Sequence, residues 1–150
     1  MQYWLMKSEP SAFSIDDLAN APHQTTPWDG VRNYQARNFM KQMQLGDLAF
    51  FYHSNCQVPG IVGIIEICKL AYPDFTALDK QDLHYDPKST LEKPIWEMVE
   101  VRFKEQLPRL ISLKELQTYH QHLDMPLLRK GNRLSIMPVT KEQWLFIQQL

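Results

Sequence analysis

Side chains that could bind a flat, polar ligand are concentrated in the segment WDGVRNYQARN, residues 28–38. It combines an Asp-Gly turn with a tryptophan, a tyrosine, two arginines and two asparagines. A nucleobase outside a duplex presents a π-face and a hydrogen-bonding edge, so its pocket needs aromatic walls and polar groups that read the edge. The segment supplies both kinds of group and is the first candidate for a binding site.

Residues elsewhere in the chain could complete such a pocket. The candidate aromatic walls are Trp4, Trp28, Tyr52 and Trp96, the candidate edge-reading groups are Asn33, Ser54 and Asn55, and the candidate phosphate contacts are Lys7, Arg32 and Arg37.

Most of these candidates also have a purely structural interpretation. Tryptophan is highly buried on average, so Trp4 and Trp96 are more often core residues. Asn33 could cap the helix that follows it, and Arg37 could pair along the surface of that helix. Trp28 follows a proline in a polar loop and precedes Asp-Gly, where a structural tryptophan is less expected.

No catalytic or metal-binding motif is present. The chain has no P-loop, no GxGxxG and no HExxH. His53 and Ser54 are neighbours in a predicted strand, where successive side chains point to opposite faces and cannot easily share a proton. Because the chain has only two cysteines, Cys56 and Cys68, a structural zinc site is not expected. We expect no enzymatic activity and no cofactor.

Composition limits the general class of protein. A chain of 150 residues is long enough for one domain with a single sizeable core. The net charge of −1 argues against a long, non-specific grip on a polyanion, although a local basic patch is compatible with it. The chain has no signal-peptide pattern and no run of about 18 apolar residues. We expect a cytoplasmic protein with reduced cysteines, no membrane association and, in the absence of heptads, a monomeric state.

The pattern of apolar residues predicts one mixed domain over residues 1–150. Strands are expected at 2–7, 47–54, 60–72, 95–107 and 133–139, and helices at 14–20, 33–43, 112–123 and 140–150. Ser14, Ser112 and Thr140 are the expected N-caps, with Glu115 in the capping-box position after Ser112. The second and third strands are almost continuously apolar, so both faces should be buried. The strands follow one another without regular helical crossovers, which favours a small twisted barrel or an α+β sheet.

The polar stretch 73–94 is predicted to be a long loop between strands. A loop of that length inside a compact domain is usually functional or disordered.

Several separated motifs resemble the EVE domain family. They are YWLMKSEP at 3–10, WDGVRNYQARNFM at 28–40, GDLAFFYHSN at 46–55, PGIVGIIEI at 59–67, HYDPKS at 84–89 and MPLLRKGNRLSIMPVT at 125–140. They extend over essentially the whole chain in the expected order. The one mild departure is His84, where the family often has tyrosine.

The resemblance implies an α+β, PUA-like fold, which is a small mixed β-barrel with helices packed around it. It also implies a reader of a modified base in DNA or RNA, of modified-cytosine or methylated-adenine type, that acts with a separate effector protein. In that likeness Trp28 is the stacking wall, Lys7, Ser8 and Glu9 line the pocket, and Asn33, Tyr52, His53 and Ser54 add contacts. Leu128 and Arg129 would lie on a closing loop that borders the same cavity, with Arg133 beyond it.

Two other functions remain open from the residues alone. One is a PUA-type RNA-binding domain that recognises shape and phosphates without reading a modification, although the near-neutral composition makes this less attractive. The other is a protein that binds, or acts on, a small metabolite or nucleoside in the same pocket. Fold alone does not decide among these functions.

Overall fold

The computed structural model describes residues 1–150. The strands are β1 (Tyr3–Ser8), β2 (Thr25–Pro27), β3 (Leu48–His53), β4 (Gly60–Pro73), β5 (Glu97–Ser112) and β6 (Ile136–Val139). The helices are α1 (Ile15–Ala19), α2 (Tyr34–Gln42), α3 (Leu113–Thr118) and α4 (Lys141–Gln148), with 3-10 turns at Pro22–Gln24, Phe75–Leu78 and Pro126–Leu128.

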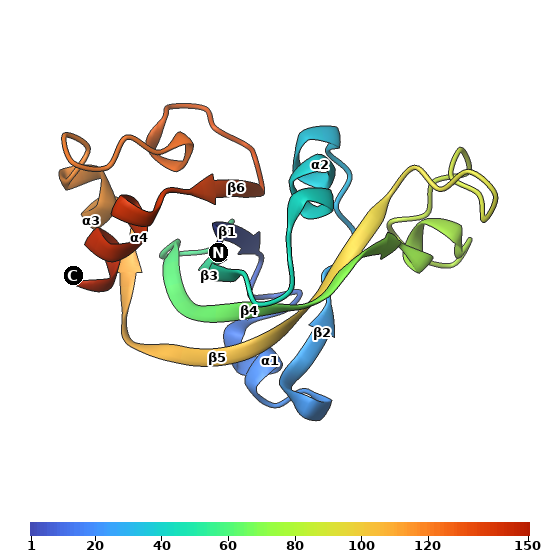
Figure 1. Ribbon diagram of the computed structural model, residues 1–150, viewed down its shortest axis with the longest axis horizontal. Coiled ribbons are helices and arrows are strands. Elements are labelled where there is room, and N and C mark those ends of the chain that lie inside the picture. The colour runs from blue at the N-terminus through green and yellow to red at the C-terminus, as the bar shows by residue number, and fades with distance from the viewer.

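All six strands form one mixed sheet in the order β2-β5-β4-β3-β1-β6. The pair β1–β3 is parallel, and the chain between these two strands contains α1, β2 and α2. The other pairs are antiparallel. The register between β4 and β5 shifts at four places, and such irregularities bend the strands that carry them. Figure 1 shows both strands as long arcs that run across most of the fold.

The sheet is not closed, so the α+β class is confirmed but the expected barrel is not. β2 pairs only with β5, and β6 pairs only with β1. Both edge strands are short, and each contains a proline, Pro27 in β2 and Pro138 in β6. A proline has no N–H to offer a further strand, so these edges are poorly suited to pair with each other.

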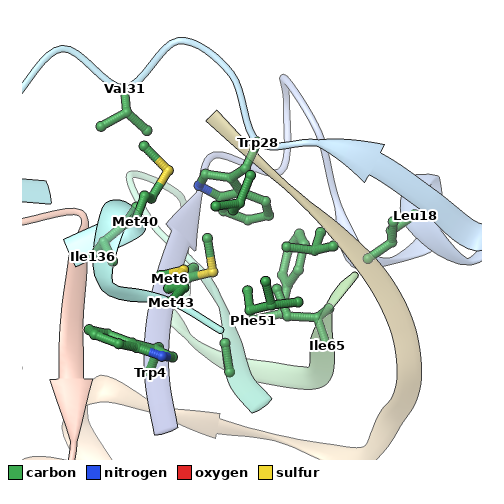
Figure 2. Packing of buried hydrophobic residues seen from close by; sticks show 14 of the residues in the cluster. Trp4, Met6, Leu18, Trp28, Val31, Met40, Met43, Phe51, Ile65 and Ile136 are labelled. Carbon is green, nitrogen blue, oxygen red and sulfur yellow. The ribbon is translucent and has the colours of Figure 1, made fainter. Parts of the chain in front are cut away.

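The central strands are buried on both faces, as their apolar runs predict. Along β3, Ala49 and Phe51 belong to one hydrophobic cluster, and Phe50 and Tyr52 belong to the other. Helices α1 and α2 contribute to the first cluster, and α3 and α4 contribute to the second. The first cluster, shown in Figure 2, is the one that Trp28 joins.

The predicted helix caps are observed, with one difference. Ser14 and Thr140 form capping boxes, and the Asn33 side chain accepts a hydrogen bond from the third residue after it. Ser112 caps α3, but the carboxylate of Glu115 pairs with Arg109 at 2.7 Å instead of reaching back to the cap. A bidentate guanidinium is a stronger partner for a carboxylate than a backbone N–H.

The long loop between β4 and β5 is ordered by its own contacts. Its two ends are tied by the hydrogen bond from the Asp74 N–H to the Trp96 carbonyl. The buried hydroxyl of Ser89 accepts from the Ile95 N–H at 2.9 Å. None of the helices, of which the longest is α2 with nine residues, has the length and apolar character of a membrane span.

Candidate nucleic-acid interface

A cavity of about 350 Å³ opens beside Trp28, and we call it the Trp28 cavity. It lies between the end of β1, the loop before α1, β2 with the turn that follows, and the loop 74–96. Its lining residues are Lys7, Ser8, Ala12, Phe13, Thr26, Pro27, Trp28, Asp29 and His84. This volume lies within the range of small-ligand pockets, about 300–1,000 Å³.

Trp28 serves the core and the cavity at once. Its side chain packs edge-on against Phe51, with ring centroids 5.5 Å apart, and the residue is 8% exposed. Its backbone N–H donates to the Val99 carbonyl at 2.7 Å, which fixes the turn against β5. In Figure 2 it lies with Val31 at the upper margin of the cluster. The indole therefore forms a rigid wall of the cavity rather than a freely exposed stacking platform.

Two charged groups in the cavity have no protein partner. The Lys7 ammonium lies 5.8 Å from the centre of the Tyr52 ring but forms no hydrogen bond or ion pair, and the Asp29 carboxylate forms none with another residue. Burial lowers the pKa of Lys7. Burial raises the pKa of Asp29, and the nearby Asp74 carboxylate raises it further. Both charged forms are thus disfavoured, which is the environment that a polar ligand edge would relieve.

The turn after Asp29 brings a histidine to the rim of the cavity. Gly30 has φ +75°, and its N–H donates to the Asp74 carboxylate at 2.8 Å. A Cβ atom at this position would lie 2.9 Å from the His84 ring. Glycine therefore meets two requirements, the left-handed backbone and the close approach of the imidazole.

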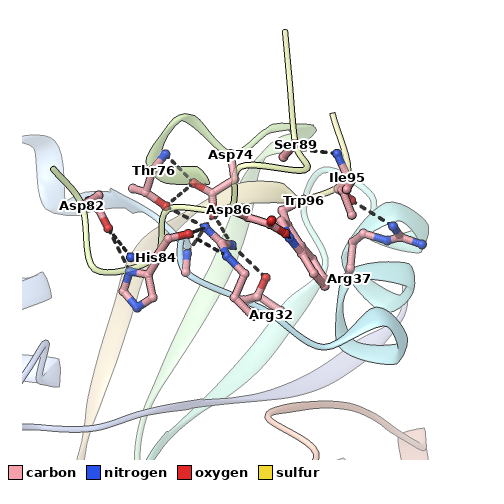
Figure 3. Close-up of polar contacts among 12 residues, drawn as sticks. Arg32, Arg37, Asp74, Thr76, Asp82, His84, Asp86, Ser89, Ile95 and Trp96 are labelled. Carbon is pink, nitrogen blue, oxygen red and sulfur yellow. Dashed lines mark hydrogen bonds and ion pairs between the residues drawn. The ribbon is translucent and has the colours of Figure 1, made fainter. Parts of the chain in front are cut away.

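Arg32 holds the loop that carries His84, as Figure 3 shows. Its guanidinium donates to the His84 carbonyl at 2.6 Å, to the Asp74 carboxylate at 3.1 Å and to the Thr76 hydroxyl at 3.1 Å. We call this set the Arg32–Asp74 network. Because its N–H groups are occupied within the protein, Arg32 positions the cavity wall and is not free to meet a phosphate.

Asp74 is the buried centre of that network, with a fully buried side chain. Burial alone would raise its pKa, but hydrogen bonds from Thr76, Gly30 and Arg32 outweigh burial and lower the pKa below its usual value. The carboxylate is therefore held ionised by the protein itself.

Trp96 and Arg37 belong to the scaffold around this network. The indole N–H of Trp96 donates to Asp86 at 2.7 Å, and its ring lies against Tyr34, 4.9 Å between centroids. Arg37 donates to the Ile95 carbonyl at 2.9 Å. Neither residue lines the Trp28 cavity, so the structure places both in the support of the loop 74–96 (Figure 3).

Three further predicted site residues belong to β1 and β3 but do not line the cavity. Trp4 is 1% exposed and donates its indole N–H to Asp47 at 3.0 Å. Tyr52 is buried, and burial raises its pKa to about 12. The ring of His53 accepts the Ile15 N–H at 3.1 Å, and burial lowers its pKa. These contacts stabilise the core and the start of α1.

The end of β1 is tied down by short polar contacts. The Ser8 hydroxyl donates to the Phe13 carbonyl at 2.6 Å, and Ser8 lines the cavity. The Ser54 N–H donates to the Ser8 carbonyl at 3.0 Å, and Glu9 accepts from the Asn55 side chain at 2.6 Å. Glu9 and Ser54 thus hold the β1 end but do not reach into the cavity.

A second depression lies between α2 and the chain before β6. It has a volume of about 470 Å³ and is lined by Asn33, Gln35, Phe39, Pro126, Arg129, Asn132, Arg133, Leu134 and Pro138. We call it the arginine groove. It shares no lining residue with the Trp28 cavity, so Asn33, Arg129 and Arg133 border a neighbouring site rather than the same one. Leu128 packs against the second hydrophobic cluster.

Comparison with known proteins identifies the family. A sequence model of the EVE domain matches residues 2–150. The chain belongs to the EVE domain family. Thymocyte nuclear protein 1 of Rattus norvegicus is 52% identical over 99% of this chain and 73% of its own length. An uncharacterised protein of Schizosaccharomyces pombe is 39% identical over 99% of this chain and 68% of its own length.

Solved structures of similar sequence share the whole fold of this EVE domain. The crystal structure of human THYN1 protein in complex with 5-methylcytosine-containing DNA has a TM-score of 0.95 at 48% identity, over 99% of this chain and 96% of that chain. A protein from Pseudomonas putida has a TM-score of 0.94 at 50% identity, over 98% and 97%.

Several lining residues of the EVE domain were not candidates from the sequence. Asp29 appeared there only as part of a turn, although its place directly after Trp28 was a usable signal. His84 lies in the long polar loop and approaches Trp28 only because the Arg32–Asp74 network docks that loop. Phe13 and Pro27 gave no signal, since an aromatic or a proline near a turn is common.

A third cavity, of about 450 Å³, lies between β5 and α4 and does not suit a base. Its walls are mostly apolar, including Phe50, Ile64 and Ile147. Its one arginine, Arg109, is held by Glu115. A site for a nucleobase needs an aromatic wall beside the polar groups that read the base edge. The third cavity has polar groups in Glu105 and Gln148, but its one aromatic residue is the fully buried Phe50.

Proposed function

We propose that this EVE domain is a non-enzymatic reader that binds nucleic acid and holds a modified cytosine, foremost 5-methylcytosine, in the Trp28 cavity. The observation that carries the proposal is the pair of unpartnered charges, Lys7 and Asp29, on the wall of a cavity of suitable volume. A relative with 48% identity is known in complex with 5-methylcytosine-containing DNA. That relative supports DNA as the nucleic acid and cytosine as the base.

The two charges match the edge of a cytosine. Cytosine carries an amino donor at N4, and it also carries a carbonyl acceptor at O2. An ionised Asp29 is acceptor-only and suits the amino group, while the Lys7 ammonium is donor-only and suits the carbonyl. Thymine has a carbonyl in place of the amino group, so it would direct an acceptor toward Asp29.

The remaining walls suit a flat ring with a methyl group. Trp28 provides a fixed aromatic surface, and Phe13, Ala12 and Pro27 provide apolar surface nearby. Apolar side chains, alanine and phenylalanine among them, are common partners of a methyl group at C5 of a pyrimidine. A base reaches such a cavity only after leaving the stack, which is easiest at single-stranded or mismatched positions.

Titration of fluorescently labelled oligonucleotides tests the proposal. Matched duplexes and single strands should carry one central 5-methylcytosine, 5-hydroxymethylcytosine, cytosine, thymine or N6-methyladenine, and anisotropy should be read at a fixed moderate salt concentration. We expect the tightest binding for 5-methylcytosine. Replacement of Lys7 by Met should reduce this preference, whereas Lys69→Met, at an exposed lysine outside the cavity, should not.

Equal affinity for all the oligonucleotides would overturn the reader function. Equal affinity combined with a steep dependence on salt would instead favour an RNA- or DNA-binding domain that contacts phosphates without reading a modification.

A further inference from the structure

We propose that the arginine groove binds the phosphodiester backbone of the strand whose base enters the Trp28 cavity. This inference rests on the proposed function, because it assigns the backbone contact of the same ligand. It concerns a separate surface, whose side chains take no part in the Trp28 cavity.

The groove contains the two arginines whose side chains donate no hydrogen bond within the protein. Four of the six arginines are engaged: Arg32, Arg37, Arg102 and Arg109 donate hydrogen bonds to carboxylates, carbonyls or side-chain oxygens. Arg133 makes no ion pair or hydrogen bond within the protein, and Arg129 has only a loose contact of 3.8 Å with the exposed Asp124. Both residues line the same depression.

Two asparagine side chains of the groove present free hydrogen-bond donors. The Asn33 side-chain oxygen accepts the Ala36 N–H at 2.9 Å, and the Asn132 oxygen accepts the Leu134 N–H at 3.1 Å. Each amide oxygen is thereby occupied, and each NH₂ group has no protein partner. No carboxylate lines the groove. A surface that presents guanidinium and amide N–H groups without an opposing acid is suited to phosphate oxygens.

The groove is adjacent to the Trp28 cavity. The Lys7 N–H donates to the Ser135 carbonyl at 2.8 Å, which joins a lining residue of the cavity to the neighbour of Leu134 in the groove. On the other side, the segment from Asp29 to Asn33 connects the two sites. A strand with one base in the cavity therefore has this groove beside it as a basic surface for its backbone.

The short basic patch is also consistent with the net charge of −1. Seven of the 16 basic side chains lie within 4 Å of an acid, the loose contact of Arg129 included. A domain of this kind would hold the backbone at a few phosphates and rely on the base for selectivity. Few contacts imply a shallow dependence on salt, since each contributes about 0.9 to the slope of log K against log salt.

The experiment measures that slope with a 5-methylcytosine duplex for the wild type and for the double variant Arg129→Gln/Arg133→Gln. We expect the variant to bind about tenfold more weakly at ~100 mM salt, with a slope lower by about two. The ratio of affinities for 5-methylcytosine and cytosine should stay the same. The free nucleoside of 5-methylcytosine, which has no phosphate, should bind both proteins equally.

Two controls separate charge from structure. The variant Arg129→Lys/Arg133→Lys keeps the charges and should keep most of the slope. Lys104→Gln/Lys114→Gln removes two charges on β5 and α3, outside both sites, and should leave the slope unchanged. Because Arg129 and Arg133 are exposed, the thermal midpoint should not change in either arginine variant.

The outcomes distinguish this inference from the proposed function. If the wild type prefers 5-methylcytosine but the double glutamine variant keeps its slope, the groove is not the backbone site and the reader function stands. If the wild type shows no base preference while the variant loses slope, the groove stands as a backbone site and the reader function fails. If the wild type binds no nucleic acid, or if the nucleoside alone loses affinity in the variant, the groove assignment is wrong.

Discussion

Asp29 and Asp74 both lie next to the turn at Gly30, but their carboxylates have opposite environments. Asp74 is fully buried and accepts hydrogen bonds from Gly30, Arg32 and Thr76, and its pKa is lowered. Asp29, one residue before Gly30, has no partner, and burial raises its pKa. The protein engages the first carboxylate completely and leaves the second one at a cavity, exposed and without a partner in another residue.

The same difference separates residues that stabilise the fold from residues that could bind a ligand. Arg32 and Trp96 have the residue types of a nucleobase site, yet their polar atoms are occupied inside the protein (Figure 3). Lys7 and Asp29 have the same kind of chemistry and are unoccupied at the cavity. A polar group that no other residue of the protein engages is available to a ligand, so its presence in a cavity is better evidence for a ligand than its residue type.

The largest expected effect is at Trp28, which belongs to both regions. Trp28→Ala removes a nearly buried ring from the core cluster and should lower the free energy of unfolding by about 3–5 kcal/mol. It should also weaken binding of a 5-methylcytosine oligonucleotide by about 1–3 kcal/mol through the lost stacking wall. Urea denaturation and anisotropy measure the two effects separately.

Trp28→Phe is the matched control because it keeps an aromatic ring. It should retain most of the stability and part of the binding. Unchanged binding in a folded Trp28→Ala variant would show that this ring serves the core alone.

Removal of the Arg32 guanidinium tests the role of the Arg32–Asp74 network. Arg32→Ala leaves the buried Asp74 without its cation and should lower the free energy of unfolding by about 3 kcal/mol. Arg102→Ala breaks an exposed pair with Glu66 and should cost less than about 1 kcal/mol. A folded, stable Arg32→Ala protein that has lost nucleic-acid binding would instead make Arg32 a ligand contact.

The sequence was a good guide to the parts of the molecule that local patterns determine. The caps Ser14, Asn33 and Thr140 and the two-faced burial of β3 follow from residues a few positions apart. The openness of the sheet did not follow from such patterns, because it depends on register shifts between β4 and β5 and on two short edge strands.

The candidate site was predictable only in part, because it too depends on contacts between residues that are distant in the sequence. Trp28, Lys7 and Ser8 do line one cavity, although whether they bind a base is still a prediction. Arg32 and Arg129 look alike in the sequence, and only the fold shows that one is occupied by Asp74 and the other is nearly free. Pairings between residues more than 40 positions apart decide such questions, and no local pattern encodes them.

Substitution of Asp29 tests whether its carboxylate selects 5-methylcytosine over thymine. Asp29→Asn keeps the shape of the side chain but replaces an acceptor-only group with one that can also donate. Thymine should then be tolerated, and the preference for 5-methylcytosine over thymine should fall by about 1–3 kcal/mol. Competition between the two unlabelled oligonucleotides for one labelled strand measures it. A preference unchanged by Asp29→Asn would place the edge-reading group elsewhere in the cavity.

The smallest expected effect is the change in the free energy of unfolding caused by Asp29→Asn, and its sign is informative. The pKa of Asp29 is raised on folding, so its contribution to stability is fully present below the unfolded pKa of about 3.9 and is lost as the pH rises through the folded pKa. Asp29→Asn should therefore stabilise the protein at neutral pH, by less than about 1 kcal/mol because the side chain is partly solvated, and the gain should vanish near pH ~3.

Asp74→Asn should show the opposite sign in the same urea titrations. The pKa of Asp74 is lowered on folding, so its contribution is present above the unfolded value and disappears as the pH falls through the folded one. The substitution should destabilise the protein at neutral pH and approach the wild type in acid. A gain in stability from Asp29→Asn together with a loss of base discrimination is the signature of a carboxylate kept for a ligand. If Asp29→Asn destabilises the protein at neutral pH, the carboxylate has a partner within the protein, and the two aspartates do not differ in the way inferred from their contacts.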